Sequence, residues 1–313
     1  MPPSSPSYTI GVLAYPGAQL AAVYGLLDLF ATANRLAHQN GHAAPQVSGL
    51  ILDRFVDAKT EKLAALIVPP SLDGGAPYEA VPGLAAGIRH HHAEGAVVCS
   101  VCAGAFLLAE TGLLDGRTVT THWALADRFA ETYPGPLLDI DKLIIDDGDI
   151  VTAGGLMAWV DLGLRLIDRF SGPAVMQATA RFFLVDPSGR EQRFYHTFQP
   201  RLDHGDAPIR KVQHWLQRRG NEAVTVPGMA AVAGLGERTF LRRFQKATGL
   251  KPSEYLQHLR VSKARDLLES SPLAFDQIAW RVGYEDSGAL RRVFQKTTGL
   301  TPGEYRKRFS PLI

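Results

Sequence analysis

A segment near the end of the chain occurs twice, and this internal repeat constrains the fold more than any other feature. Residues 240–255 read FLRRFQKATGLKPSEY and residues 290–305 read LRRVFQKTTGLTPGEY, so ten of sixteen positions are identical at a shift of 50 residues. Just upstream, residues 229–235 match residues 278–284 at a shift of 49. We therefore expect two copies of one structural unit.

Each copy has the pattern of two short helices joined by a glycine turn. Apolar residues of the segment 229–233 form one stripe at helical spacing, and Gly234 supplies the backbone angle for a sharp turn. In the next helix Phe240 and Phe244 lie one turn apart and face inward. Gly249 then ends the helix. The pattern predicts a helix-turn-helix in each copy.

The inward position of the aromatic residues turns other side chains of each second helix outward. These candidate DNA-contacting residues are Arg238, Leu241, Arg242 and Gln245 in the first copy and Ser287, Gly288, Arg291 and Arg292 in the second. Outward arginine suits a major-groove reader, because its guanidinium pairs with two acceptors of guanine. Gly288 cannot read a base edge, so we expect more phosphate contact from the second copy.

Other residues of the repeats are expected to have structural roles only. We expect Arg243 to lie on a solvated face. The residues expected in the core are Phe240, Phe244, Trp280, Tyr284 and Phe294.

The repeated region resembles the DNA-binding module of the AraC/XylS family of bacterial regulators. Residues 276–284 (DQIAWRVGY) and 294–305 (FQKTTGLTPGEY) match the family signature, and the resemblance covers roughly residues 209–309. It implies two helix-turn-helix units in successive major grooves, linked by a long helix that here would run from Pro252 to Ser270. The buried side of that helix would consist of Leu256, Leu259, Val261, Ala264, Leu267 and Leu268.

The balance of charged residues changes close to the position where the AraC-like region begins. Residues 1–205 contain 14 Lys and Arg against 21 Asp and Glu, whereas residues 206–313 contain 19 against 10. An acidic first part and a basic second part are typical of a protein in which the basic module binds a polyanion and the acidic module does not.

The acidic part alternates β-rich runs with helical patterns, which predicts an α/β domain with a flavodoxin-like parallel sheet sandwiched by helices. Strands are expected at residues 9–14, 63–68 and 96–101, and a helix at residues 20–36. We expect this domain to cover residues 1–187, a linker to cover 188–207, and an all-α domain with the two helix-turn-helix units to cover 208–313.

Cys102 lies where the strand at 96–101 passes directly into a helical pattern, followed by the small residues Ala103 and Gly104. A helix N-terminus lowers the pKa of a thiol and offers amide donors to an anion. His122, next to Trp123 at the end of a later strand, is placed to reach back toward this thiol. The alternative is that a lone cysteine in an apolar run belongs to an inert core.

Residues 100–117, 121–123, 151–155 and 161–164 resemble the ThiJ/PfpI superfamily, which has a class I glutamine-amidotransferase-like fold. Together with the AraC-type module, this resemblance identifies the chain as a member of the GlxA-type regulators. Catalytic relatives supply an acid near the start of the first helix, but the stretch 20–25 (LAAVYG) has no carboxylate. We therefore assign no catalytic residue and expect a ligand-sensing pocket around Cys102, His122, Trp123 and Gly154.

Two other functions remain open. The first is a Cys-dependent hydrolase, deglycase or hydratase fused to a DNA-binding tail. The second is a redox sensor that uses Cys99 and Cys102, although a strand would point these thiols in different directions. Residues 90–92 are all histidine, but adjacent helical residues cannot meet one ion, so we expect a surface run and no metal or cofactor.

The expected function is thus a sequence-specific DNA-binding transcription regulator responsive to a small-molecule effector of unknown identity. Its expected partners are double-stranded promoter DNA and, as the resemblance implies, a second copy of the chain through the α/β part. Residues 1–7 have no basic or apolar signal region, and no apolar run is long enough to span a bilayer. We therefore expect a cytoplasmic location and no membrane partner.

Overall fold

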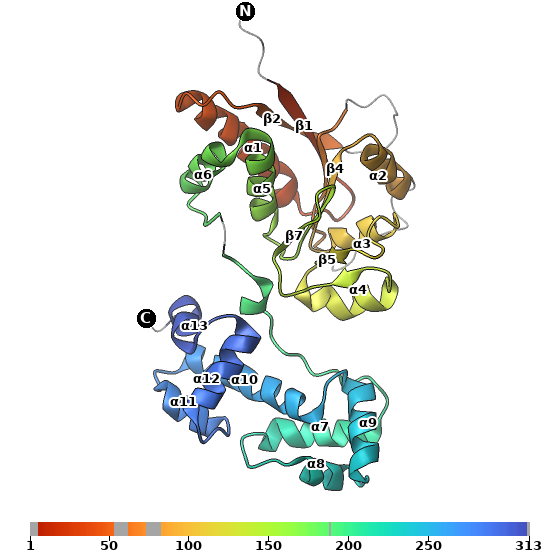
Figure 1. Cartoon of the computed structure of the whole chain (residues 1–313), viewed down its shortest axis with the longest axis vertical. Helices are drawn as coiled ribbons and strands as arrows, with labels where there is room; N and C mark the ends of the chain where they lie inside the picture. Colours follow the sequence, from red (N-terminus) through yellow and green to blue (C-terminus); the bar gives the residue numbers. More distant parts are fainter. Residues whose placement is uncertain (1–5, 53–61, 73–82, 188, 312–313) are drawn as a thin grey trace, which may run out of the picture. The chain divides into compact units, whose positions relative to one another are not determined.

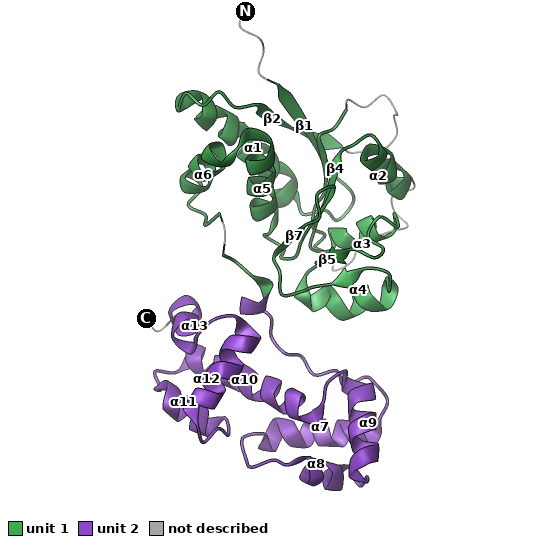
Figure 2. Cartoon of the chain, in the orientation of Figure 1, with its two compact units in different colours: residues 1–192 green, residues 193–313 purple. Residues whose placement is uncertain are grey.

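The computed structural model describes residues 6–52, 62–72, 83–187 and 189–311. Residues 1–5, which belong to the segment 1–7 considered above, lie outside the described residues, as does Ser188 in the expected linker. The chain forms two compact units, residues 1–192 and 193–313 (Figure 2). The boundary between them falls inside the segment 188–207 that the sequence predicts as a linker.

The first unit is built on a six-stranded sheet in the order β2-β1-β3-β4-β8-β7. These strands are β1 (Ser7–Leu13), β2 (Gln46–Leu52), β3 (Ala65–Val68), β4 (Val97–Val101), β7 (Ile144–Asp146) and β8 (Ile150–Ala153). All pair in parallel except β7, which is antiparallel to β8 because a turn of only three residues joins them. Two further strands, β5 (Thr118–Val119) and β6 (Leu137–Leu138), pair separately. The α/β expectation is confirmed, with one antiparallel edge strand added.

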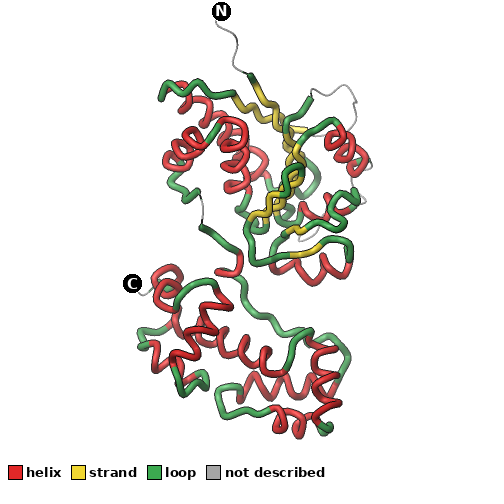
Figure 3. The backbone as a smooth tube through the Cα atoms, in the orientation of Figure 1, coloured by secondary structure: helices red, strands yellow, loops and turns green. Residues whose placement is uncertain are grey.

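Helices cover both faces of this sheet (Figures 1 and 3). Helices α1 (Leu20–Gln39), α5 (Trp159–Ser171) and α6 (Pro173–Phe182) pack together on one face. Helices α2 (Leu84–Ala93) and α3 (Gly104–Ala109) lie on the other, and α4 (Ala126–Thr132) follows β5. Connections between parallel strands are right-handed. The chain moves from β1 to β2 in one direction along the sheet and from β3 to β4 in the opposite direction, so the connecting helices lie on opposite faces. Because both faces are covered, β3, β4 and β8 are buried throughout.

The strand order reverses between β1 and β3, and the carboxyl ends of the parallel strands meet at one edge. Tyr15 follows β1, Pro69 follows β3, Cys102 follows β4 and Gly154 follows β8. The hydroxyl of Tyr15 donates a hydrogen bond of 2.7 Å to the carbonyl of Pro69 and ties two of these ends together. In open α/β sheets this edge is where ligands bind.

The second unit is helical and has two separate cores. Its helices are α7 (Ala207–Arg219), α8 (Val226–Ala233), α9 (Glu237–Thr248), α10 (Pro252–Ser270), α11 (Phe275–Arg281), α12 (Ser287–Thr298) and α13 (Pro302–Phe309). Helix α10 contributes Leu256 and Leu259 to the first core and Val261, Ala264 and Leu268 to the second. The expected linker helix is therefore confirmed, with Leu267 only partly buried.

One core expectation is wrong: Trp280 is 77% exposed. Ile278 and Ala279 fill the inward face of α11 and Val282, directly after it, is also buried, so the helical period turns position 280 toward solvent. The matching position in the first copy, Ala231, is exposed as well. Phe240, Phe244 and Phe294 are fully buried, and Tyr284 packs against the second core.

The three consecutive histidines do not form a uniform surface run. His90 is exposed, but His91 is buried, and the Nε2 atom of His92 lies 2.7 Å from Oδ2 of Asp149. Successive helical side chains point in different directions, so one reaches the core while its neighbours face outward. Within the described ranges, no group of His, Cys, Asp and Glu is arranged to hold a metal ion. No helix in the same ranges has the length and apolar character needed to cross a bilayer.

Candidate nucleic-acid interface and N-terminal site

The first helix-turn-helix consists of α8 and α9. The side chain of Thr225 caps α8 by accepting a hydrogen bond of 3.2 Å from the amide of Gly228. Gly234 ends α8 in the left-handed region, with a φ of 68°, as the sharp turn requires. The predicted contact residues of α9, namely Arg238, Leu241, Arg242 and Gln245, are all exposed.

The second helix-turn-helix consists of α11 and α12. Asp286 caps α12, since its carboxylate accepts hydrogen bonds from the amides of Gly288 and Ala289 at 2.8 and 3.1 Å. Of the predicted contact residues, Arg291 and Arg292 are exposed, whereas Ser287 and Gly288 are partly exposed.

The arginines of the two units differ in their freedom. Arg291 lies over the ring of Phe275 at 5.2 Å, and Arg292 lies 3.7 Å from a carboxylate oxygen of Asp286. In the part of the chain that the structure describes, Arg238 and Arg242 form no ion pair. The first helix-turn-helix therefore offers the more available guanidinium groups.

Arg243 does not lie on a freely solvated face as the sequence suggests. Its guanidinium donates two hydrogen bonds to Asp206, at 2.8 and 2.9 Å. These hydrogen bonds lower the pKa of Asp206 below its ordinary value. Arg243 therefore connects the N-terminus of α7 to α9, and its guanidinium is paired with Asp206.

Cys102 occupies a tight turn between β4 and α3. Its φ is +55°, a left-handed conformation that residues other than glycine rarely adopt. Its amide donates to the carbonyl of Ala153 at 2.7 Å, and its own carbonyl accepts from the hydroxyl of Thr121 at 2.8 Å. A Cβ on Gly104 would lie 2.5 Å from the carbonyl oxygen of Val68, so the turn requires glycine there.

The thiol of Cys102 is not activated in the way that the sequence suggests. The residue is only 5% exposed, and burial raises the pKa of its thiol to about 11. An amide hydrogen bond from Ala103 acts in the opposite direction but is outweighed. The expectation of a lowered thiol pKa is wrong, because burial disfavours the thiolate more than the amide hydrogen bond from Ala103 favours it.

His122 immediately precedes the short helix η2 (Trp123–Leu125), which begins with Trp123 and lies beside this turn. The Nδ1 atom of His122 accepts a hydrogen bond of 3.1 Å from the amide of Ala124, and the two rings lie 5.3 Å apart. Burial lowers the pKa of His122 and so favours the neutral ring. His122 thus uses its Nδ1 atom within its own loop, and Thr121 provides the hydrogen bond between this loop and the backbone of Cys102.

Gln192 is the residue of this site that sequence reasoning missed. It is 2% exposed, and its amide nitrogen donates to the hydroxyl of Thr120 and to the carbonyls of Thr121 and Lys142, each at 2.9 Å. Its amide oxygen accepts from the amide of Trp123 at 3.1 Å. The sequence predicts a linker here, although the aromatic residues just after Gln192 are a signal of a docked segment.

Gln192 also explains the glycine at position 154. A Cβ on Gly154 would lie 1.9 Å from Nε2 of Gln192, so the Gln192 side chain fills the space above Gly154. Three of the four predicted pocket residues, His122, Trp123 and Gly154, are thus gathered around the loop and the side chain of Gln192.

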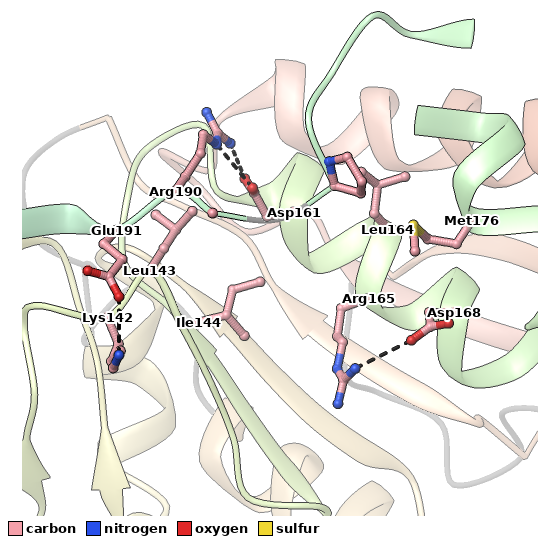
Figure 4. Close-up of a pocket in the computed structure, with 12 residues that line it drawn as sticks. Lys142, Leu143, Ile144, Asp161, Leu164, Arg165, Asp168, Met176, Arg190 and Glu191 are labelled. Carbon is pink, nitrogen blue, oxygen red and sulfur yellow. Dashed lines mark hydrogen bonds and ion pairs between the residues drawn. The ribbon is translucent and has the colours of Figure 1, made fainter. Parts of the chain in front are cut away.

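A separate cavity of about 440 Å³ lies in the same unit and contains none of the four predicted pocket residues (Figure 4). Its apolar wall includes Leu143, Ile144, Leu164 and Met176. Ion pairs between Arg190 and Asp161, Lys142 and Glu191, and Arg165 and Asp168 lie around it. Its volume falls in the range of small-molecule sites.

Comparisons with known proteins match both units. The helix-turn-helix domain family matches residues 229–308, and the DJ-1/PfpI family matches residues 44–169. The transcriptional regulator CdhR of Pseudomonas aeruginosa is 30% identical over 221 residues, which cover 70% of this chain and 66% of CdhR. The regulator GlxA of Rhizobium meliloti is 28% identical over 205 residues, 62% of this chain and 61% of GlxA.

A shorter similarity links the chain to an enzyme. Isonitrile hydratase of Pseudomonas putida is 36% identical over 85 residues, which cover 27% of this chain and 36% of that enzyme. The chain aligns with less than two thirds of the length of each of these three relatives.

Proposed function

This chain belongs to the AraC-type transcription regulators that carry a DJ-1/PfpI domain, and on this premise we propose that it binds promoter DNA sequence-specifically under the control of a small molecule. The observation that carries DNA binding is the pair of helix-turn-helix units with exposed arginines, Arg238 and Arg242 on α9 and Arg291 and Arg292 on α12. We propose that the protein acts in the cytoplasm, where the promoter DNA of a bacterial regulator lies.

Selection of sites from a random DNA pool by the full-length protein tests DNA binding. The expected result is a recurrent sequence with two contacted stretches one helical turn apart, since each unit enters one major groove. Recovery of a pool without sequence preference would overturn the proposal.

The effector is proposed to bind at Cys102, His122, Trp123 and Gly154. Support comes from Cys102 and Gly154, which follow β4 and β8 at the carboxyl edge of the sheet, and from Thr121, whose hydroxyl bonds the loop that carries His122 and Trp123 to the backbone of Cys102. The cavity of Figure 4 is the competing location in the same unit.

A thermal-shift screen of amino acids and quaternary amines tests effector binding. A ligand at about a hundred times its Kd stabilises the fold by about 2.7 kcal/mol. His122→Ala should abolish the shift if the ligand binds at the predicted site, whereas Arg165→Met should abolish it if the ligand binds in the other cavity. A shift that both variants retain would contradict both locations.

Binding, and not turnover, is the proposed role of this site. The stretch 20–25 offers no carboxylate to share a proton with the thiol, and the raised pKa of Cys102 keeps the thiol protonated at neutral pH. Assays on amides, isocyanides and glyoxal adducts should therefore show no turnover. Turnover that Cys102→Ala abolishes would instead establish an enzyme.

A homodimer through the α/β unit is proposed as the DNA-binding form. Leu20 and Tyr24 lie one turn apart on α1 and are 64% and 57% exposed, which is an apolar face suited to a second copy. Light scattering should give twice the chain mass, and Tyr24→Asp should shift the protein toward monomer. A monomeric wild-type protein at the concentrations used for DNA binding would exclude this form.

A further inference from the structure

The side chain of Gln192 is held inside the first unit. It makes four hydrogen bonds to residues 120, 121, 123 and 142, and its backbone amide donates to Asp141 at 3.0 Å. Two of its partners, Thr121 and Trp123, flank His122. Because Gln192 also fills the space above Gly154, a ligand that contacts His122, Trp123 and Gly154 must contact or displace Gln192.

The residues that follow Gln192 are held inside the second unit by Arg265 of α10. The Arg265 guanidinium donates to the carbonyls of Arg193 and Phe194 at 3.2 and 2.7 Å and also to the carbonyl of His196. Arg265 is only 4% exposed, and its Nε atom has no hydrogen-bond partner. These carbonyls therefore compensate much of the desolvation of a buried cation, and their displacement would be costly.

Side-chain packing also keeps residues 193–196 against the second helix-turn-helix. Phe194 is 7% exposed, and a Cβ on Gly299, at the end of α12, would lie 2.9 Å from its ring. Arg308 of α13 lies over the rings of Phe194 and Tyr195 at 5.1 and 5.8 Å. The segment 193–196 is thus packed against the end of α12, the helix that carries Arg291 and Arg292.

Residues beyond this point contact the first core of the second unit. The ring of Phe198 contacts Tyr255 edge-on at 5.1 Å, and the carbonyl of Arg201 accepts a hydrogen bond of 2.8 Å from Gln213. The segment between Arg193 and Asp206 therefore contacts both cores of the second unit.

We propose that residues 192–196 form a coupling segment in which Gln192 senses the state of the loop at Thr120–Trp123 and Arg265 transmits it to the second helix-turn-helix. The physical reason is continuity: no residue separates the anchored side chain of Gln192 from the first carbonyl that Arg265 holds. Displacement of Gln192 must then move Arg193 or strain its hydrogen bond to Arg265. This inference rests on the proposed function, because it assigns the route by which an effector would change DNA affinity.

Hydrogen exchange on the full-length protein without DNA or effector tests the segment directly. Gln192→Glu keeps the size of the side chain but removes the amide nitrogen that donates to three oxygens. Gln192→Ala removes both this donating nitrogen and the accepting oxygen. We expect faster exchange at residues 120–123 and, by about 5-fold or more, at residues 193–196 and in the C-terminal half of α10. Arg265→Lys should produce the reciprocal effect at residues 120–123, because coupling between sites is mutual.

Asn34→Ala is the matched control, since the Asn34 side chain likewise bonds to backbone groups, the amide and carbonyl of Val47, within the first unit. Its effect should remain near Val47. Effects of the Gln192 variants that stop at residue 192, or an Asn34 effect that also reaches residues 193–196, would overturn the coupling segment.

Affinity for a selected DNA site provides the second measurement. Both Gln192 variants should change it by about 5-fold or more, whereas Asn34→Ala should leave it unchanged. Unchanged affinity in both Gln192 variants would overturn the coupling segment while DNA binding by the wild type still stood. A wild-type protein that selects no DNA would instead defeat the proposed function, and the exchange experiment would remain decisive for the segment.

Discussion

At the scale of single residues, the two helix-turn-helix units differ in how free their arginines are. Arg242 is exposed and forms no ion pair among the described residues, so its guanidinium can turn toward a base edge. We expect Arg242→Ala to lose about 1–3 kcal/mol of discrimination at one base pair. Competition binding with single-base variants of a selected site measures this loss.

Arg292→Ala is the matched comparison, because Arg292 occupies the same position of the repeat but lies beside Asp286. It should weaken binding nearly equally for all sequences, as the loss of a phosphate contact does. Identical base-specific losses in the two variants would show that the units do not differ in this way.

The Cys102 thiol leads to a pH prediction. Its pKa is raised to about 11, so the thiolate is scarce at neutral pH and its fraction rises as the pH approaches that value. Alkylation of Cys102 by iodoacetamide, followed by mass spectrometry, should be much slower at pH 7 than for a free cysteine and should accelerate up to about pH 11. Rapid labelling that levels off near pH 8 would contradict a buried, protonated thiol.

At the scale of elements, the turn between α8 and α9 depends on the backbone of Gly234. Its φ of 68° is costly for residues with a Cβ, so Gly234→Ala should destabilise the second unit by about 1 kcal/mol. Urea denaturation of the full-length protein measures the change.

Gly303 provides a control at which substitution by alanine should change the stability in the opposite direction. It lies in the first turn of α13, and an added Cβ would meet no atom within 4 Å. Alanine favours the helix over glycine, so Gly303→Ala should stabilise by roughly 0.5–1 kcal/mol. Equal effects of the two substitutions would mean that the left-handed angle at Gly234 is not what the turn requires.

At the scale of the whole molecule, charge is divided between an acidic first part and a basic second part. Affinity for DNA should therefore fall steeply with salt, by about 10³–10⁵ between 50 and 200 mM if about 6–10 phosphates are contacted. Titrations of one selected site at several salt concentrations provide the slope, and a flat profile would exclude phosphate contacts as the main source of affinity. Removal of the Arg292 side chain should reduce the slope by about one.

Much of the architecture followed from local patterns in the sequence. The 50-residue repeat, the inward Phe240 and Phe244, and the buried side of α10 are all confirmed, because the helical period and glycine turns are properties of neighbouring residues. The position of Cys102 between β4 and α3 could be predicted for the same reason.

Only the tertiary structure decided what surrounds these residues. Burial raised the pKa of Cys102 against the expected helix effect, Trp280 turned to solvent, and Arg243 paired with Asp206, 37 residues away. Gln192 entered the space above Gly154 from a segment expected to be a linker. Desolvation and pairing depend on which distant segments pack together, and no local periodicity contains that information.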